Sequence, residues 1–326
     1  MSSCVFATRR IPRPGLELLE KATDLRVFEE DRMPTRGEIR EGLVGCVGLL
    51  SLLTDRIDGE LMDAGDLTVI SNYAVGVDNI DLEAATRRGI MVTNTPVDGL
   101  RESPADHTFA LLLALSRRVV EGDRMVRDGA FQGWGPELLL GTDVYGKTLG
   151  IVGAGGIGTA VARRALGFGM EILYHSREPK EEWGREGGAR FVSLPELLRE
   201  ADFVTLHVPL KEDTRHLIGA EELQMMKQGA FLVNTSRGPV VDEAALVHAL
   251  GKDRLAGAAL DVYEHEPKVA QDLLTMSNVV VTPHTASATW ETRSEMAIVA
   301  ANSLLAGLRG EVPPSLVNPE VLSSQN

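Results

Sequence analysis

Short apolar runs of about four to seven residues recur along the chain and alternate with longer stretches of helix-like spacing. Runs of this length, bounded by glycine, proline and polar residues, are typical of strands buried on both faces. Regular alternation of such strands with helices favours parallel sheets that are covered by helices. The strands that this pattern predicts cover residues 4–8, 47–53, 68–73, 90–93, 149–152, 171–175, 203–208, 230–235, 256–262 and 279–282.

Two longer stretches have the period of helices. Residues 103–120 place Leu111, Leu112 and Leu115 on one apolar face, and residues 290–308 form a second such stretch after the last strand. The helix expected at 290–308 comes after the last strand of the second sheet, so it does not connect two strands of that sheet. We therefore expect one domain made of residues 1–99 and 287–326, with a second domain of residues 100–286 inserted into it.

A glycine-rich loop lies between the strand expected at 149–152 and the helix expected from residue 156. In this context the glycines of a G-x-G-x-x-G pattern allow a tight turn, close approach of a pyrophosphate, and close packing of helix on strand. The N–H groups at the start of the helix favour phosphate. The second domain is therefore predicted to bind a dinucleotide in a Rossmann fold. The loop residues are Gly153, Ala154, Gly155, Gly156, Ile157 and Gly158.

The residues after the next expected strand bear on which dinucleotide is bound. A site for NAD(H) usually has an acidic residue about 20 residues after the loop, where it bonds the ribose hydroxyl. Ser176 and Arg177 stand at that place, and Arg177 could form a charged fork on a 2′-phosphate. As alternatives, Arg177 could be a solvated loop residue, and Glu178 could take the ribose role. We expect NADP(H) to be preferred, with NAD(H) possible.

Three later residues have side chains suited to one reaction. Arg237, Glu266 and His284 each follow an apolar run, and strand ends are where an open α/β sheet builds its site. A guanidinium can hold a carboxylate in a bidentate fork, and an imidazole can give a proton to a ketone oxygen. A carboxylate can orient that imidazole. Each residue alone is weak evidence, but together they predict hydride reduction of a 2-keto acid.

Composition narrows the possible partners. The length of 326 residues suits two domains. The net charge of −14 argues against binding nucleic acid or an anionic membrane. No apolar run is long enough to span a bilayer, and no signal segment is apparent, so we expect a cytoplasmic protein. Cys4 and Cys46 lack metal-ligand spacing and fit reduced thiols, and we expect no metal site.

Taken together, these motifs resemble the D-isomer-specific 2-hydroxyacid dehydrogenase family, in particular its glyoxylate/hydroxypyruvate reductases. Residues 71–81 and 143–148 add to a resemblance that covers nearly the whole chain. It implies a Rossmann cofactor domain inserted into a flavodoxin-like substrate domain, each a doubly wound parallel α/β sheet. It also implies that Arg237 binds the substrate carboxylate, that His284 is the general acid/base, and that Glu266 orients His284.

The resemblance further implies particular contacts and an assembly. A homodimer is expected, in which the loop around Trp134 reaches towards the partner, and Asp261 would bond the nicotinamide amide. Pro104 stands where many relatives carry a small polar residue near the nicotinamide, so no polar side-chain contact with the nicotinamide is expected from this position. Substrate contacts are expected from Leu53, Val75, Gly76, Arg237 and His284. Further cofactor contacts are expected from Val208, Pro209, Thr214, Thr235, Ser236, Arg237, Asp261, His284 and Ala286.

The expected activity is NAD(P)H-dependent reduction of glyoxylate or hydroxypyruvate to the D-2-hydroxy acid. Reduction of 2-ketogluconate or another longer 2-keto acid is an alternative that needs only a roomier pocket. An NAD(H)-sensing, corepressor-like binding protein would belong to another class but could keep the same fold and triad. The acidity of the chain counts against that role. Phosphite is also disfavoured as a substrate, because Val75 stands where the related phosphite dehydrogenases carry a lysine.

Overall fold

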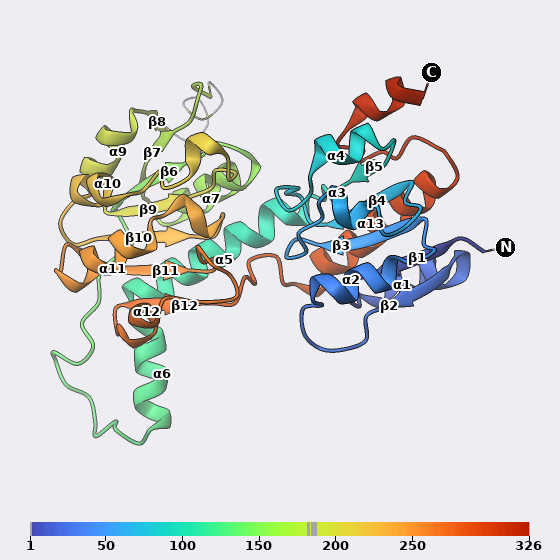
Figure 1. Cartoon of the computed structure of the whole chain (residues 1–326). Coiled ribbons are helices and arrows are strands. Elements are labelled where there is room, and N and C mark those ends of the chain that lie inside the picture. Colours follow the sequence, from blue (N-terminus) through green and yellow to red (C-terminus); the bar gives the residue numbers. More distant parts are fainter. Residues whose placement is uncertain (1, 181–182, 184–187, 326) are drawn as a thin grey trace. The chain divides into compact units, whose positions relative to one another are not determined.

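The structure is a computed structural model that describes residues 2–180, 183 and 188–325 (Figure 1). The chain divides into two compact units, each with its own sheet. The first unit comprises Met1–Leu100 and Ala288–Asn326, and the second comprises Arg101–Ser287. The second unit is therefore continuous in sequence, whereas the first is assembled from both ends of the chain.

The first unit contains a five-stranded parallel sheet in the order β2-β1-β3-β4-β5, which is the flavodoxin-like doubly wound order. Buried side chains of α1 and α13 pack on one face of the sheet, and those of α2, α3 and α4 pack on the other. The elements are β1 (Cys4–Ala7), α1 (Arg13–Ala22), β2 (Asp24–Val27), α2 (Arg36–Leu43), β3 (Gly48–Leu52), α3 (Gly59–Met62), β4 (Val69–Tyr73), α4 (Leu82–Arg87), β5 (Met91–Thr93), α13 (Trp290–Leu308) and the 3-10 helix η3 (Pro319–Gln325).

The second unit contains a seven-stranded parallel sheet in the order β12-β11-β10-β9-β6-β7-β8. Buried side chains of α5 and α7 cover one face, and those of α9, α10 and α11 cover the other. The helices are α5 (Gly99–Ser116), α6 (Val119–Arg127), α7 (Gly156–Gly167), α9 (Leu194–Glu200), α10 (Ala220–Met225), α11 (Glu243–Gly251) and α12 (Gln271–Thr275). The strands are β6 (Thr148–Val152), β7 (Glu171–His175), β8 (Arg190–Phe191), β9 (Phe203–Leu206), β10 (Ala230–Asn234), β11 (Leu255–Leu260) and β12 (Val279–Val281). The predicted fold class, two doubly wound parallel α/β sheets with a Rossmann unit, is confirmed.

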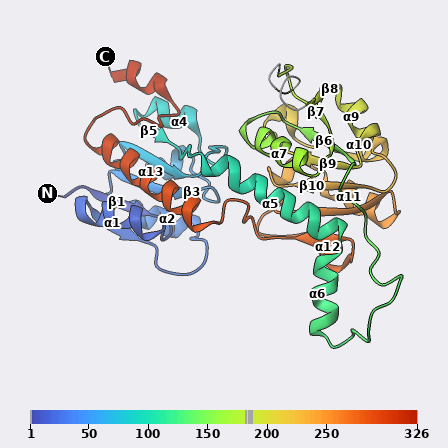
Figure 2. The ribbon, with the colours of Figure 1, turned by 180° about the vertical axis from the view of Figure 1, so that it is seen from behind.

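The helix expected over residues 103–120 is wrong in its extent. The structure has two helices there, because Arg118 takes a left-handed φ of 53° between the end of α5 and the start of α6. α6 and the loop that follows it project from the body of the second unit, as Figure 2 shows from behind. Two short strands, β2 and β8, were not expected. Their residues are exposed or only partly buried, so no apolar run marks them.

The expectation of two reduced cysteines is also wrong, since Cys4 and Cys46 form a disulfide with Cα atoms 4.5 Å apart. The cause lies in the sheet. β1 and β3 are neighbours, and Val5 is in register with Gly48, so Cys4 at the start of β1 lies close to Cys46, two residues before β3. A sequence separation of 42 residues hides this proximity.

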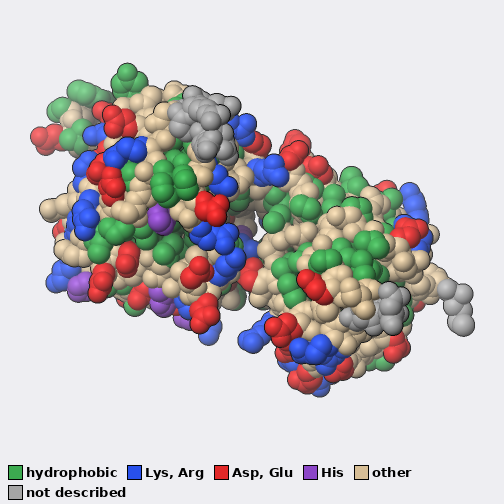
Figure 3. Space-filling view, turned by 90° about the horizontal axis from the view of Figure 1, so that it is seen from above, with side chains coloured by type: hydrophobic (Ala, Val, Ile, Leu, Met, Phe, Trp, Pro, Cys, Tyr) green, Lys and Arg blue, Asp and Glu red, His purple; other side chains and the backbone are tan. Residues whose placement is uncertain are grey.

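The surface carries charges of both signs. On the face shown in Figure 3, acidic and basic side chains are interspersed. Many of them pair, for example Arg88 with Asp63 and Arg164 with Asp106. No helix within the described ranges is both long enough and apolar enough to cross a membrane.

Candidate active site

The carboxyl ends of the strands in the second unit carry most of the residues that the sequence singled out. The strand order reverses between β6 and β9, and the carboxyl ends of strands at such a reversal are where open α/β sheets bind ligands. The glycine-rich loop follows β6, and Val208 and Pro209 follow β9. The loop and this segment therefore both leave the sheet at the point where the strand order reverses.

Two glycines of the loop are required by close packing. Gly153 has a φ of 108°, and a Cβ atom there would lie 2.6 Å from the carbonyl oxygen of His207. A Cβ atom on Gly158 would lie 2.1 Å from the carbonyl oxygen of Gly153. By contrast, Gly155 faces open space, with nothing within 4 Å of its would-be Cβ. Together with the N-terminus of α7, this geometry fits the pyrophosphate of a dinucleotide.

The residues expected to choose between dinucleotides lie at the end of β7, next to β6. The Ser176 hydroxyl donates a hydrogen bond to the carbonyl oxygen of Glu178, which closes a turn. Arg177 and Glu178 are exposed. Both side chains can therefore reach a ligand without losing a buried partner.

Three other expected cofactor residues are held by local hydrogen bonds. Thr214 closes the loop after β9, since its hydroxyl donates to the carbonyl oxygen of Pro209 at 2.7 Å. Thr235 is buried, with its Oγ1 2.9 Å from Oγ1 of Thr108. The Ser236 hydroxyl donates to Oδ1 of Asn234 at 2.8 Å. The segment after β10 is thus rigidly held.

Arg237, Glu266 and His284 follow three neighbouring strands, β10, β11 and β12. Oε2 of Glu266 lies 2.9 Å from Nδ1 of His284, so the structure brings these two together. The other oxygen of Glu266 accepts from the amide of Tyr263 at 3.1 Å. Both side chains of the pair are about three-quarters buried, with 24% of His284 and 26% of Glu266 exposed.

Arg237 is positioned by its own loop. Its Nη1 donates to the carbonyl oxygen of Ser236 at 2.9 Å, and its carbonyl oxygen accepts from Nδ2 of Asn234 at 3.0 Å. Asn234 is the last residue of β10 and is 1% exposed. An amide at the end of an apolar strand is the sequence signal that could have identified Asn234.

Asp261 follows β11 and is fully buried. Its carboxylate accepts from the hydroxyl of Thr282 and from the amides of Thr285 and Ala286. Burial alone would raise the pKa of this carboxyl, but these bonds and one from His107 outweigh it and hold the pKa below its ordinary value. Asp261 is therefore an ionised group whose oxygens are already engaged within the protein.

The expected substrate residues Leu53, Val75 and Gly76 belong to the first unit, where they follow β3 and β4. The carbonyl oxygen of Val75 accepts from Asn94 Nδ2 at 2.9 Å, and that of Gly76 accepts from Asn72 Nδ2 at 2.8 Å. These two amides hold the loop in shape. Neither amide was predicted as a site residue, although Asn72 stands in a buried strand.

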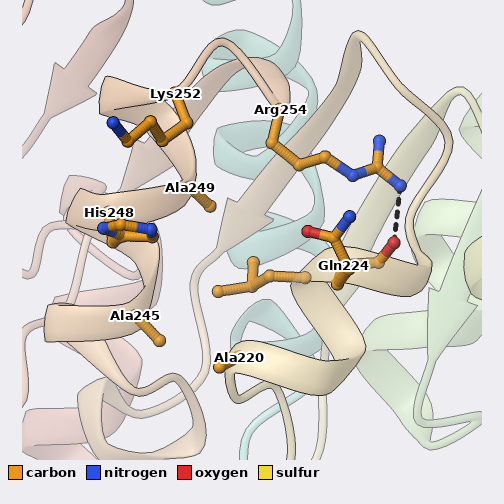
Figure 4. Close-up of a pocket in the computed structure, with 8 residues that line it drawn as sticks. Ala220, Gln224, Ala245, His248, Ala249, Lys252 and Arg254 are labelled. Atoms are coloured by element: carbon orange, nitrogen blue, oxygen red, sulfur yellow. Dashed lines mark hydrogen bonds between the residues drawn. The ribbon is translucent and has the colours of Figure 1, made fainter.

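The second unit has two hollows, one away from the triad and one beside Glu266. The first has a volume of about 390 Å³ and lies between α10 and α11 (Figure 4). It is lined by Ala220, Leu223, Gln224, Ala245, His248, Ala249, Lys252 and Arg254. The second, of about 610 Å³, is lined by Glu266 and its neighbours His265 and Pro267–Ala270, together with Glu243. Over the described part of the chain, no group of three or more His, Cys, Asp or Glu residues could hold a metal ion.

Comparison with known proteins identifies the family. Residues 109–286 match the sequence profile of a family described as D-isomer specific 2-hydroxyacid dehydrogenase, NAD binding domain. Glyoxylate reductase of Korarchaeum cryptofilum is 53% identical over 325 residues, which span 99% of this chain and 98% of that protein.

Solved structures agree with this assignment. A crystal structure of a protein from Thermus thermophilus matches with a TM-score of 0.90 at 49% identity, covering 96% of this chain and 99% of that one. An NADPH-dependent glyoxylate/hydroxypyruvate reductase from Sinorhizobium meliloti, solved with NADP and malonate, matches with a TM-score of 0.83 at 33% identity, covering 98% of each chain. The chain therefore belongs to the D-isomer-specific 2-hydroxyacid dehydrogenase family and is an oxidoreductase that acts on CH–OH groups.

Proposed function

We propose that this protein reduces glyoxylate or hydroxypyruvate to the 2-hydroxy acid, in the D configuration where the product is chiral. The observation that carries the proposal is the bond between Glu266 and His284, beside the strand end that bears Arg237. A carboxylate on Nδ1 leaves Nε2 of the imidazole to serve a substrate oxygen. The name of the Korarchaeum relative, glyoxylate reductase, supports the choice of substrate.

Each member of the triad has one task in this reaction. Arg237 binds the carboxylate of the keto acid, which places the ketone carbon in reach of the nicotinamide. A bound dinucleotide supplies the hydride, which adds to that carbon. His284 transfers the proton on Nε2 to the ketone oxygen as the C=O π electrons move onto it, and Glu266 keeps the ring oriented and stabilises the charge. In the reverse direction His284 is the base.

We assign the cofactor contacts to residues of the second unit, and part of the substrate contacts to residues of the first. We assign the phosphates to the loop at Gly153–Gly158 and to α7, and the nicotinamide end to the strand ends that carry Thr235, Asp261 and Ala286. Substrate contacts in the first unit are assigned to Leu53 and to the backbone of Val75 and Gly76. We expect NADP(H) to be preferred because Arg177 is exposed beside the loop, and the NADPH-dependent relative from Sinorhizobium meliloti supports this preference.

A homodimer is proposed on the evidence of α6 and the loop after it. None of the residues of α6 is buried, although the helix carries Val119 and Val126 at 56% and 62% exposure. The loop adds Phe131 and Trp134, which are 51% and 85% exposed. Apolar side chains gathered on one projecting segment are typical of an interface. We assign this surface to a second copy of the chain, and we retain a cytoplasmic location as a prediction.

Absorbance at the nicotinamide band tests the function directly. The purified protein is mixed with NADPH or NADH and with glyoxylate, hydroxypyruvate or 2-ketogluconate, and kcat/KM is compared. We expect the highest value for NADPH with one of the two small acids. Faster reduction of 2-ketogluconate would favour the longer-substrate alternative. Tight binding of NADH without oxidation by any keto acid would favour a dinucleotide-sensing protein.

A further inference from the structure

The turn that presents His284 is held in an uncommon backbone conformation. His284 has a φ of 54°, in the left-handed region that residues other than glycine rarely adopt. Three consecutive amides of this turn donate to one residue, Asp261. The His284 amide donates to the Asp261 carbonyl oxygen at 2.9 Å, and the amides of Thr285 and Ala286 donate to its Oδ1 and Oδ2 at 2.8 Å each. The position of Asp261 therefore sets the position of His284.

Asp261 is in turn held by two side chains. A fully buried carboxylate needs hydrogen bonds to stay ionised in place. The Thr282 hydroxyl donates to Asp261 Oδ1 at 2.6 Å. Nε2 of His107 lies 3.2 Å from Thr282 Oγ1 and 3.3 Å from Asp261 Oδ1. Because the Thr282 proton points to Asp261, an Nε2–H of His107 can be shared between the Thr282 oxygen and Asp261 Oδ1.

His107 belongs to α5, which reaches the same turn at a second place. The Ser103 hydroxyl donates to the carbonyl oxygen of Ala286 at 2.9 Å. Ser103 and His107 are one helical turn apart and share a face of α5. The helix thus contacts this part of the chain at two places: Ser103 binds Ala286, and His107 lies against Thr282 and Asp261. All of these residues belong to the second unit.

We propose that His107 is a positioning residue for catalysis, which acts through Thr282 and Asp261 to hold the turn that carries His284. The inference rests on the proposed role of His284 as general acid. His107 does not need to touch substrate or cofactor for this role. Loss of its donor frees Thr282 and Asp261 to move, and a small displacement of an acid group lowers the rate of proton transfer strongly.

The test compares His107→Leu, which removes the donor, with His107→Gln, whose amide nitrogen can replace Nε2. Thr282→Val and Thr282→Ser form a second such pair. His248→Leu is the matched control, since His248 is an exposed histidine on α11 in the same unit. For each protein we measure kcat and KM for glyoxylate, the Kd of NADPH by fluorescence, and amide hydrogen exchange in the peptide that covers residues 282–287.

We expect His107→Leu and Thr282→Val to lower kcat about tenfold or more, while KM stays within about twofold and any change in the NADPH Kd, transmitted through the freed Asp261, is smaller than the change in kcat. Exchange should speed up at the 282–287 peptide and not in the β6 strand. His107→Gln and Thr282→Ser should recover most of the loss, and His248→Leu should match the wild type.

Three results would overturn the proposal. One is an unchanged kcat and unchanged exchange in His107→Leu. Another is a weaker NADPH Kd with unchanged exchange, which would place His107 at the cofactor. The third is faster exchange throughout the unit that His107→Gln does not repair, which would make the role structural. If the wild type does not reduce glyoxylate, the proposed function fails, but the exchange data still decide whether His107 holds the turn.

Discussion

Glu266 and His284 lie 18 residues apart in sequence and in loops that follow different strands, yet their side chains meet at 2.9 Å. They meet because β11 and β12 are parallel neighbours, so that both loops leave the sheet at the same edge. The chemistry of the site therefore depends on sheet topology more than on either loop alone.

Glu266→Gln should lower kcat for glyoxylate by about tenfold or more, with little change in NADPH affinity. An amide carries no charge to stabilise the imidazolium, and it can present its NH2 group to Nδ1. Steady-state kinetics and fluorescence titration give the two numbers. Glu221→Gln, an exposed glutamate on α10, is the control. Equal kcat in Glu266→Gln and the wild type would mean that the pair plays no part in turnover.

Arg237→Ala should reduce kcat/KM for glyoxylate by roughly 30- to 5,000-fold, which corresponds to about 2–5 kcal/mol for a truncated charge pair. Arg237→Lys should recover only part of this, because an ammonium cannot form the bidentate fork. The NADPH Kd should stay close to that of the wild type. Arg199→Ala on the exposed side of α9 serves as control. Wild-type kcat/KM in Arg237→Ala would remove Arg237 from the substrate site.

Arg177→Ala should lower kcat/KM with NADPH by about tenfold and leave the value with NADH nearly unchanged. The guanidinium is exposed at the end of β7, where it can pair with a 2′-phosphate that NADH lacks. Glu178→Gln tests the competing assignment, since a ribose contact by Glu178 would make that variant lose activity with NADH. A wild type that prefers NADH would also contradict the NADP(H) assignment.

His207 should make the second unit sensitive to mild acid. Both of its ring nitrogens are buried and lack a hydrogen-bond partner among the described residues, although part of the residue stays accessible. Burial lowers the pKa of this imidazole from 6.5 to about 3. Below pH 6.5 the unfolded chain takes up a proton that the folded chain refuses, so stability is present above that pH and falls as pH drops towards 3.

From pH 7 to pH 5 this difference amounts to about 2 kcal/mol in the free energy of unfolding. Urea denaturation at the two pH values, followed by fluorescence, measures it. His207→Leu should lose the dependence, whereas His248→Leu, an exposed histidine, should keep it. The same pH dependence in His207→Leu and in the wild type would show that another group titrates.

The sequence predicts elements well where burial is continuous. The helix expected at 290–308 and the strand expected at 171–175 agree with α13 and β7 at both ends, because each is packed within one core. The break at Arg118 was missed, since nothing in the apolar pattern requires a left-handed residue there.

Partners that are distant in sequence were also beyond prediction. His107 and Thr282 are 175 residues apart. They meet only because α5 packs on one face of the seven-stranded sheet, and Thr282 directly follows β12 at the edge of that sheet. The residue types of the candidate site and the pairing of Glu266 with His284 could be recognised from the motifs, but the bonds that His107 and Thr282 make with Asp261 could not. Those bonds depend on which strand lies next to which, and local spacing does not encode strand order.

The division of the first unit between the two ends of the chain also has a consequence for biosynthesis. α13 supplies Met296, Ala297, Ala300 and Leu304 to the same core as Leu16 and Leu19 of α1. During translation the early strands can supply part of that core, but it stays incomplete until α13 leaves the ribosome. The second unit is one unbroken segment and can complete its sheet sooner, since domains generally fold as units. The part of the protein that is made first is thus completed last.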